Sequence, residues 1–183
     1  MRLKEKVAIV TGAANGIGAE ISRTFAREGC HVVLADLAAE QAAALAAEIT
    51  HSTGIKAISA CCNVAEKGDL QCVVDACVAE FGTVDILVNN AGITLPACPV
   101  EDISPERWLQ VLGIDLMGAI YGTQCVIPVM KAHRSGKIIN MASVAGQVGG
   151  VFTEATYPVS KAGVICWAKA VAKQVGEYNI TCN

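Results

Sequence analysis

Short apolar runs, rich in β-branched residues, alternate along the whole chain with longer stretches of helical periodicity. The apolar runs predict strands at residues 6–10, 31–36, 56–61, 84–88 and 136–141. The stretches between them predict helices at residues 16–28, 38–50, 66–81, 104–131 and 155–177. This alternation favours an α/β fold: a doubly wound parallel sheet of the Rossmann type, with right-handed crossovers and helices on both faces.

The chain ends soon after the last predicted helix. Residues 179–183 resemble the opening of a sixth strand, and a doubly wound sheet of this class has at least six. No repeat, low-complexity tract or linker divides the sequence. We therefore expect residues 1–183 to form a single domain, truncated at the start of the sixth strand with the last strands missing.

Composition narrows the possible partners and the compartment. The net charge of −3 gives no reason to expect nucleic acid or an anionic membrane as a partner. No apolar run approaches the roughly 20 residues that span a bilayer, and we expect no signal peptide before the first strand. The nine cysteines form an odd number without metal-like pairing. We therefore expect mostly buried, reduced thiols and a cytoplasmic protein.

A glycine-rich loop, Thr11-Gly12-Ala13-Ala14-Asn15-Gly16-Ile17-Gly18, joins the first predicted strand to the first helix. Gly12 permits a tight turn, Gly16 lets the backbone approach a pyrophosphate, and Gly18 allows close contact between helix and strand. The free N–H groups at the start of the helix would bind the anion. The strand before the loop and the helix after it make the pattern informative.

Asp36 closes the second strand, and it indicates which dinucleotide is bound. A carboxylate at this position accepts hydrogen bonds from the adenosine ribose hydroxyls and repels a 2′-phosphate. Leu37 follows, so no arginine is present there to favour a phosphate. We expect NAD(H) in preference to NADP(H). Alternatively Asp36 caps the helix that begins at Ala38, and the two roles are compatible.

Further motifs follow in a definite order. Asn89-Asn90-Ala91-Gly92 ends the fourth strand, Ser143 follows the fifth, and Tyr157-x-x-x-Lys161 comes fourteen residues later. Together with the spacing Thr-Gly-x-x-x-Gly-x-Gly, these motifs resemble the short-chain dehydrogenase/reductase family from Leu3 to the last residue. The resemblance implies hydride transfer between a nicotinamide and a secondary alcohol or ketone.

The residue types suit that chemistry. Lys161 lies four residues after Tyr157 and on the same helical face, where its ammonium stabilises the tyrosinate. Tyr157 can then act as the acid or base near neutral pH. The resemblance implies that Lys161 also holds the nicotinamide ribose, and that Ser143 binds the substrate oxygen and polarises it.

Two positions depart from the family pattern. Asp115 stands where the family usually has an asparagine that holds a water in a proton relay. It can still bind that water, pair with Lys161, or bond only to nearby backbone, and we include it as a catalytic candidate. Asn63-Val64 matches a position where the family commonly has aspartate and valine beside the adenine, so only Asn63 departs, and asparagine can serve there.

The motifs and the resemblance together predict that the single domain 1–183 is both dinucleotide-binding and catalytic. They also identify the expected site residues, and no metal ligands are expected. Ser143 and Tyr157 are the expected substrate contacts. The expected cofactor contacts are Gly12, Asn15, Gly16, Ile17, Gly18, Asp36, Leu37, Asn63, Val64, Asn90, Ala91, Gly92, Tyr157 and Lys161.

Substrate and assembly are less constrained. Within the family the chain resembles 3-oxoacyl-carrier-protein reductases and secondary-alcohol, sugar-alcohol or hydroxysteroid dehydrogenases. The mostly apolar segment 147–152 favours a substrate with hydrocarbon character. The resemblance implies a homodimer or homotetramer through helices 104–131 and 155–177. Trp108 and Trp167 are candidate contacts there, unless they simply pack against the sheet.

Two other functions remain open. The first is a catalytically silent NAD(H)-binding module, or an inactive fragment. The second is an epimerase or dehydratase that shares Tyr-x-x-x-Lys. Such relatives have larger C-terminal domains and a tighter glycine pattern, so the oxidoreductase is favoured.

Overall fold

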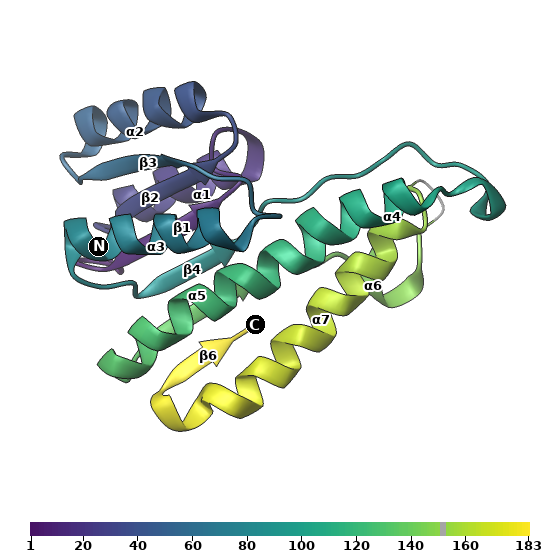
Figure 1. Cartoon of the computed structure of the whole chain (residues 1–183). Coiled ribbons are helices and arrows are strands. Elements are labelled where there is room, and N and C mark those ends of the chain that lie inside the picture. The colour runs from purple at the N-terminus through teal and green to yellow at the C-terminus, as the bar shows by residue number, and fades with distance from the viewer. Residues whose placement is uncertain (151–152) are drawn as a thin grey trace.

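The computed structural model describes residues 1–150 and 153–183, and their strands form a single parallel sheet (Figure 1). The order across the sheet is β3-β2-β1-β4-β5-β6, and every neighbouring pair is parallel. The predicted opening of a sixth strand is therefore a paired strand. The bounds are β1 (Val7–Thr11), β2 (His31–Asp36), β3 (Ala57–Cys61), β4 (Ile86–Asn89), β5 (Gly136–Asn140) and β6 (Ile180–Cys182).

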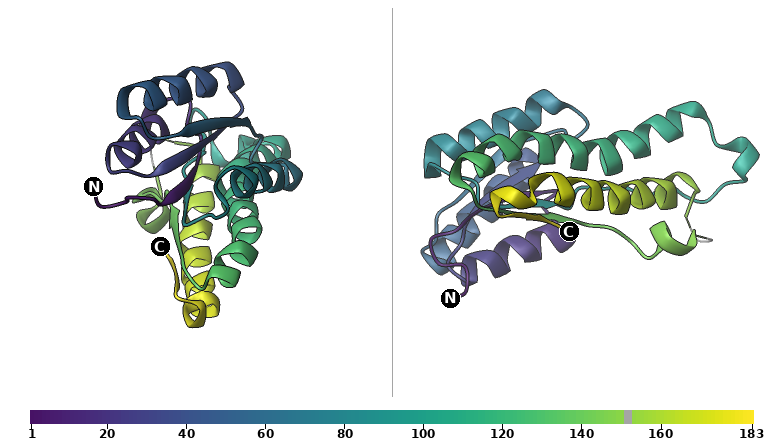
Figure 2. Two further views of the ribbon diagram at one scale, coloured as in Figure 1. Left: turned by 90° about the vertical axis from the view of Figure 1, so that its left-hand side faces the viewer. Right: turned by 90° about the horizontal axis from the view of Figure 1, so that it is seen from below.

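Helices cover both faces of the sheet, as Figure 2 shows. Apolar residues of α1 and α2 pack on one face, and those of α3, α5 and α7 pack on the other. The Rossmann-type architecture expected from the sequence is thus confirmed. The bounds are α1 (Gly16–Arg27), α2 (Ala39–Thr53), α3 (Lys67–Phe81), α4 (Pro105–Val111), α5 (Gly118–His133), α6 (Ala145–Val148) and α7 (Thr156–Val175).

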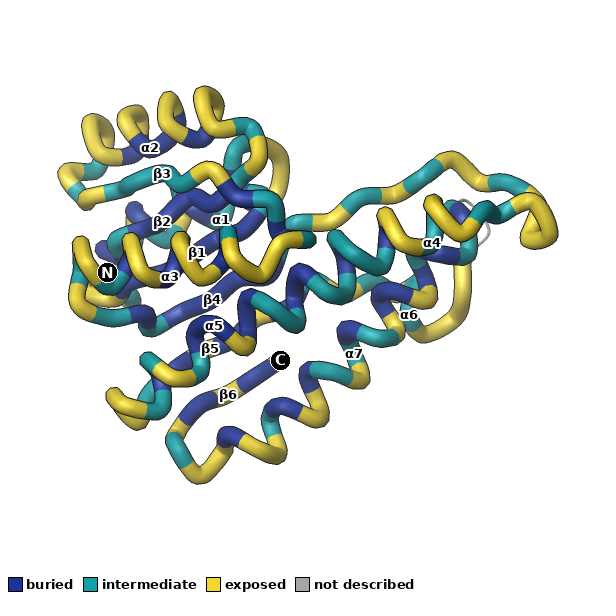
Figure 3. Tube along the Cα trace, in the orientation of Figure 1, coloured by how far each residue is buried: buried dark blue, intermediate teal, exposed yellow. Residues whose placement is uncertain are grey.

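The central strands are buried and the last strands are partly open. Every residue of β1 is buried, because helices lie over both of its faces (Figure 3). In β5 burial alternates, and Lys137 and Ile139 are exposed. Helices α1 and α2 therefore leave their side of β5 open in the described part of the chain.

The long helix expected at 104–131 is interrupted. It comprises α4, a π-helical turn at Leu112–Met117, and α5. Such π turns occur frequently at functional sites, and this one contains Asp115. Sequence periodicity did not reveal it, because one wider turn barely changes the apolar pattern.

This same stretch, Pro105–His133, is long and apolar enough to cross a membrane by length and composition alone. Length and composition thus give a membrane-span candidate where the sequence analysis expected none. However, 44% of its most apolar window is buried within the protein. Cys125, Val126 and Met130 of α5 pack into the main core. We interpret the stretch as a core helix.

The strand order creates a crevice. The chain builds outward from β1 through β2 to β3, and then returns to place β4 on the other side of β1. The connections after β1 and β4 therefore leave in opposite directions. Ligands of open α/β sheets bind at such a switch point, outside the carboxyl ends of the strands.

Candidate active site

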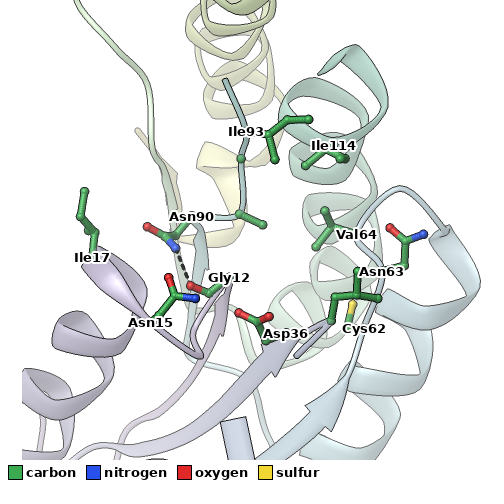
Figure 4. Close-up of a pocket in the computed structure, with 13 residues that line it drawn as sticks. Gly12, Asn15, Ile17, Asp36, Cys62, Asn63, Val64, Asn90, Ile93 and Ile114 are labelled. Carbon is green, nitrogen blue, oxygen red and sulfur yellow. Dashed lines mark hydrogen bonds between the residues drawn. The ribbon is translucent and has the colours of Figure 1, made fainter. Parts of the chain in front are cut away.

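A pocket of about 410 Å³ lies at this switch point (Figure 4). Most of its lining comes from the predicted cofactor contacts, whereas Cys62, Ile93 and Ile114 were missed by the sequence analysis. These three are ordinary apolar residues, so no local signal marks them. The lining is Gly12, Asn15, Ile17, Asp36, Leu37, Cys62, Asn63, Val64, Asn90, Ala91, Gly92, Ile93 and Ile114.

The glycine loop packs directly against the end of β4. A Cβ atom on Gly18 would lie 2.1 Å from the carbonyl oxygen of Gly12 and 2.6 Å from Nδ2 of Asn90. Asn90 Nδ2 donates to the carbonyl oxygens of Thr11 at 2.8 Å and Gly12 at 3.0 Å, the latter drawn in Figure 4. Gly12 has a φ of +63°, which favours glycine. The expected tight turn and close helix contact are therefore both present.

Asp36 bonds to backbone on both of its sides, and one of these contacts is the expected one at the start of the second helix. Its Oδ1 accepts a hydrogen bond from the N–H of Ala38 at 2.9 Å, at the start of α2. Its Oδ2 accepts one from the N–H of Ala14 at 2.8 Å, within the glycine loop. Each carboxylate oxygen keeps a further lone pair, and the residue lines the pocket. The carboxylate is thus oriented by backbone and still able to accept from a ligand.

A smaller pocket of about 250 Å³ continues from the first one. The two share Ile17, Asn90, Gly92 and Ile93. We refer to the smaller pocket as the inner pocket. It is also lined by Thr94, Met141, Ala142, Tyr157 and Lys161. The fold therefore brings the predicted Tyr-Lys pair to the inner end of the pocket lined by the glycine loop.

Tyr157 and Lys161 lie on one face of α7. The helix begins at Thr156, so Pro158 falls in its first turn, where proline is tolerated. Lys161 Nζ is 5.6 Å from the centroid of the Tyr157 ring and donates to the carbonyl oxygen of Met141 at 2.9 Å. The ammonium is thus fixed beside the phenol by backbone of the segment after β5.

Asp115 contacts the same lysine. Its Oδ2 is 3.5 Å from Lys161 Nζ, and its Oδ1 accepts from the N–H of Ile93 at 2.8 Å. Its side chain is fully buried, and burial raises its pKa, although the N–H of Ile93 and the charge of Lys161 oppose this rise. Asp115 therefore pairs with Lys161 and also bonds to backbone, which are two of the three possibilities considered for it.

Ser143 lies just after β5, and its Oγ accepts from the N–H of Ala145 at 3.2 Å. The hydroxyl thus holds the turn into α6 and keeps its own proton to donate. Ser143 does not line the inner pocket, although its neighbour Ala142 does. Of the apolar segment 147–152, residues 151 and 152 lie outside the described residues, and Val148 is 77% exposed.

The chain is similar to known dehydrogenases and reductases. The family model for short chain dehydrogenase matches residues 6–183. The 3-oxoacyl-[acyl-carrier-protein] reductase FabG of Thermotoga maritima is 39% identical over 183 residues, covering all of this chain and 73% of the relative. D-threitol dehydrogenase of Mycolicibacterium smegmatis is 41% identical over 182 residues, covering 100% of this chain and 69% of the relative.

Solved structures include a close match. The crystal structure of an NAD+-bound xylitol dehydrogenase superimposes with a TM-score of 0.94 and 33% identity, covering 100% of this chain and 70% of that one.

Proposed function

This chain belongs to the short-chain dehydrogenase family of oxidoreductases, and from that premise we propose that it transfers hydride between NAD(H) and a secondary alcohol or ketone. The observation that carries the proposal is the position of Tyr157 and Lys161. Both line the inner pocket, which opens into the pocket of the glycine loop and Asp36. The proposed proton-transfer group therefore adjoins the crevice proposed for the nucleotide.

The residues present fit a dinucleotide. Gly16 has a φ of +54° with open space around its Cβ position, at the positive end of α1. The pocket lining contains one acid, Asp36, and no lysine or arginine. That charge pattern favours NAD(H) over NADP(H), because a 2′-phosphate would meet a carboxylate without a compensating cation. Nicotinamide, when bound, supplies the hydride chemistry.

The chain's own residues would handle the proton. Tyr157 takes a proton from the alcohol during oxidation and gives one to the carbonyl oxygen during reduction. Lys161 stabilises the tyrosinate and binds the ribose hydroxyls, held in place by the carbonyl oxygen of Met141. Ser143 donates a hydrogen bond from its hydroxyl to the substrate oxygen and stabilises charge there.

The proposal extends to substrate, assembly and location. We propose a small alcohol, ketone or 3-oxoacyl substrate in the cytoplasm, and a homodimer or homotetramer through α4, α5 and α7, with residues 1–183 acting as one domain. Trp108 is half-buried on α4 and fits such a contact. Trp167 packs on the main core and donates to Thr123 Oγ1 at 3.5 Å, so its role is mainly internal.

One observation favours a second candidate, a silent NAD(H)-binding module. The carboxylate of Asp115 competes for the charge of Lys161, which weakens the stabilisation of a Tyr157 anion. In that case the protein would bind NADH without turnover.

Activity measurements on a substrate panel separate the two candidates. NADH oxidation is measured against ketones and 3-oxoacyl thioesters for the wild type and Tyr157→Phe. We expect turnover to fall by about 10²–10⁴-fold in Tyr157→Phe with NADH affinity preserved. Tyr178→Phe is the matched control, because it removes a hydroxyl from a ring that contacts Lys131 rather than the site. NADH binding without turnover on any substrate would favour the module.

A further inference from the structure

A fully buried carboxylate, Glu154, lies two residues before α7 and has no part in the proposed chemistry. Its Oε2 accepts from Arg107 Nε at 2.5 Å and from the thiol of Cys98 at 3.2 Å. Its Oε1 accepts from the hydroxyl of Thr156 at 2.9 Å. One side chain therefore joins α4, the connection between β4 and α4, and the start of α7.

Arg107 extends this junction to the backbone of the connection. Its Nη2 donates to the carbonyl oxygen of Pro96 at 3.0 Å, while its Nε is bound to Glu154. Pro96 also forms an antiparallel bridge with Thr153. We refer to residues 95–98 as the strap. The strap is thus tied to α4 on one side and to the segment before α7 on the other (Figure 1).

Both walls of the inner pocket lead directly into this junction. Ile93 and Thr94, which line the pocket, immediately precede the strap. Tyr157 also lines the pocket, and its N–H donates to the carbonyl oxygen of Glu154 at 3.2 Å. A shift of Glu154 would therefore move Tyr157 and the Ile93–Thr94 wall relative to each other.

We propose that Glu154, paired with Arg107, is a positioning residue that sets the distance between Tyr157 and the wall formed by Ile93 and Thr94. This inference rests on the proposed function of Tyr157. An ion pair suits the task because the planar guanidinium reaches two acceptors in fixed directions, which an apolar contact does not. Burying a carboxylate beside a partly exposed guanidinium adds little stability compared with apolar packing, so the directional role of the pair is the better explanation.

The test uses Glu154→Gln, which keeps the shape and removes the charge, and Arg107→Lys, which keeps the charge but cannot reach both acceptors. Glu48→Gln is the matched control, because Glu48 pairs with Arg23 at 2.8 Å on an exposed surface. Three quantities are measured: turnover per titrated NADH-binding site, NADH affinity, and amide hydrogen exchange of residues 93–98 and 154–157.

For Glu154→Gln we expect turnover per binding site to fall by about tenfold or more, since small misplacements of reacting groups are costly. NADH affinity should stay within about threefold, because the nucleotide pocket does not include Glu154. Exchange of the strap amides should be faster. Arg107→Lys should be intermediate, and Glu48→Gln should match the wild type in all three measurements.

A lower unfolding midpoint with unchanged turnover per binding site would show a merely structural carboxylate and overturn the proposal. If the wild type turns over no substrate, the proposed function fails by itself. The exchange measurement then decides on the junction, and unchanged exchange in Glu154→Gln overturns it. Should Glu154→Gln fail to fold, Arg107→Lys and Cys98→Ala provide the same readouts.

Discussion

The contact between Gly18 and Gly12 can be tested with a single methyl group. In Gly18→Ala the new Cβ would lie 2.1 Å from the carbonyl oxygen of Gly12 and 2.9 Å from its carbonyl carbon. These are backbone atoms, and the N–H of Gly12 is itself bonded to the carbonyl oxygen of Ala35 at 2.9 Å. No side chain can rotate away to relieve the overlap, so helix and strand must separate.

The size of the effect follows from that geometry. Real Cβ atoms almost never approach closer than 3.0 Å, so the 2.1 Å contact requires a shift of about 0.9 Å (3.0 − 2.1). Overpacking of this kind costs about 1–3 kcal/mol, which lowers the folded-to-unfolded ratio by about 5–160-fold. Because the shift moves the N-terminus of α1, NADH affinity should fall by about tenfold or more.

Urea unfolding and a fluorescence titration with NADH measure the two effects. Gly68→Ala is the matched control: it is the same substitution, in the first turn of α3, with no atom within 4 Å of the new Cβ. It should stabilise the protein by about 0.4–1 kcal/mol by restricting the unfolded chain. Equal stability and equal NADH affinity in Gly18→Ala and the wild type would refute the close contact and the role assigned to it.

Two further substitutions and one labelling reagent test other parts of the protein. Burial raises the pKa of Asp115, so the folded state binds this proton more tightly than the unfolded state. Wild-type stability should therefore fall as pH rises from the usual aspartate range through the raised pKa. Urea unfolding measured at several pH values should show that the stability of Asp115→Asn lacks this part of the decrease. Identical dependence of stability on pH in the wild type and the variant would contradict this. Asp36→Asn removes the charge and one of two acceptor oxygens. NADH affinity should drop by about tenfold, and the ratio of NADPH to NADH affinity should rise; an unchanged ratio in binding titrations would argue against this role. Thiol labelling at pH 8 with mass spectrometry should modify the exposed cysteines and spare three buried ones, because burial raises the pKa of those three to about 12; rapid labelling of those three would contradict it. The exposed residues are Cys61, Cys72 and Cys166, and the three with raised pKa are Cys30, Cys62 and Cys77.

Local requirements made much of the site predictable. The glycine loop was recognisable because a left-handed turn at Gly12 and a contact too close for a side chain at Gly18 restrict each position to one residue type. The placement of Asp36 followed from its position at the end of an apolar run. The spacing of Tyr157 and Lys161 was informative because residues four apart share a helical face.

The environment of Lys161 was not predictable to the same degree. Sequence reasoning left three possibilities for Asp115, and only packing brought Oδ2 to 3.5 Å from Lys161 Nζ and Oδ1 to the N–H of Ile93. The π turn that contains Asp115 has no sequence signature of its own. The hydrogen bond from the N–H of Ala14 to Asp36 was likewise decided by where the glycine loop folds back onto the carboxylate.

Alternating apolar and helical segments thus determined the parallel sheet with helices on both faces, because backbone geometry and periodicity act over a few residues. The assignment of Tyr157 and Lys161 as the proton-transfer pair rests on motif spacing and family resemblance and stays a prediction. Tertiary structure decided which distant groups meet around that pair. Arg107 and Glu154 are 47 residues apart, and nothing in the neighbourhood of either marks them as partners. Contacts of this kind depend on how whole helices pack, which is a property of the complete fold rather than of any segment.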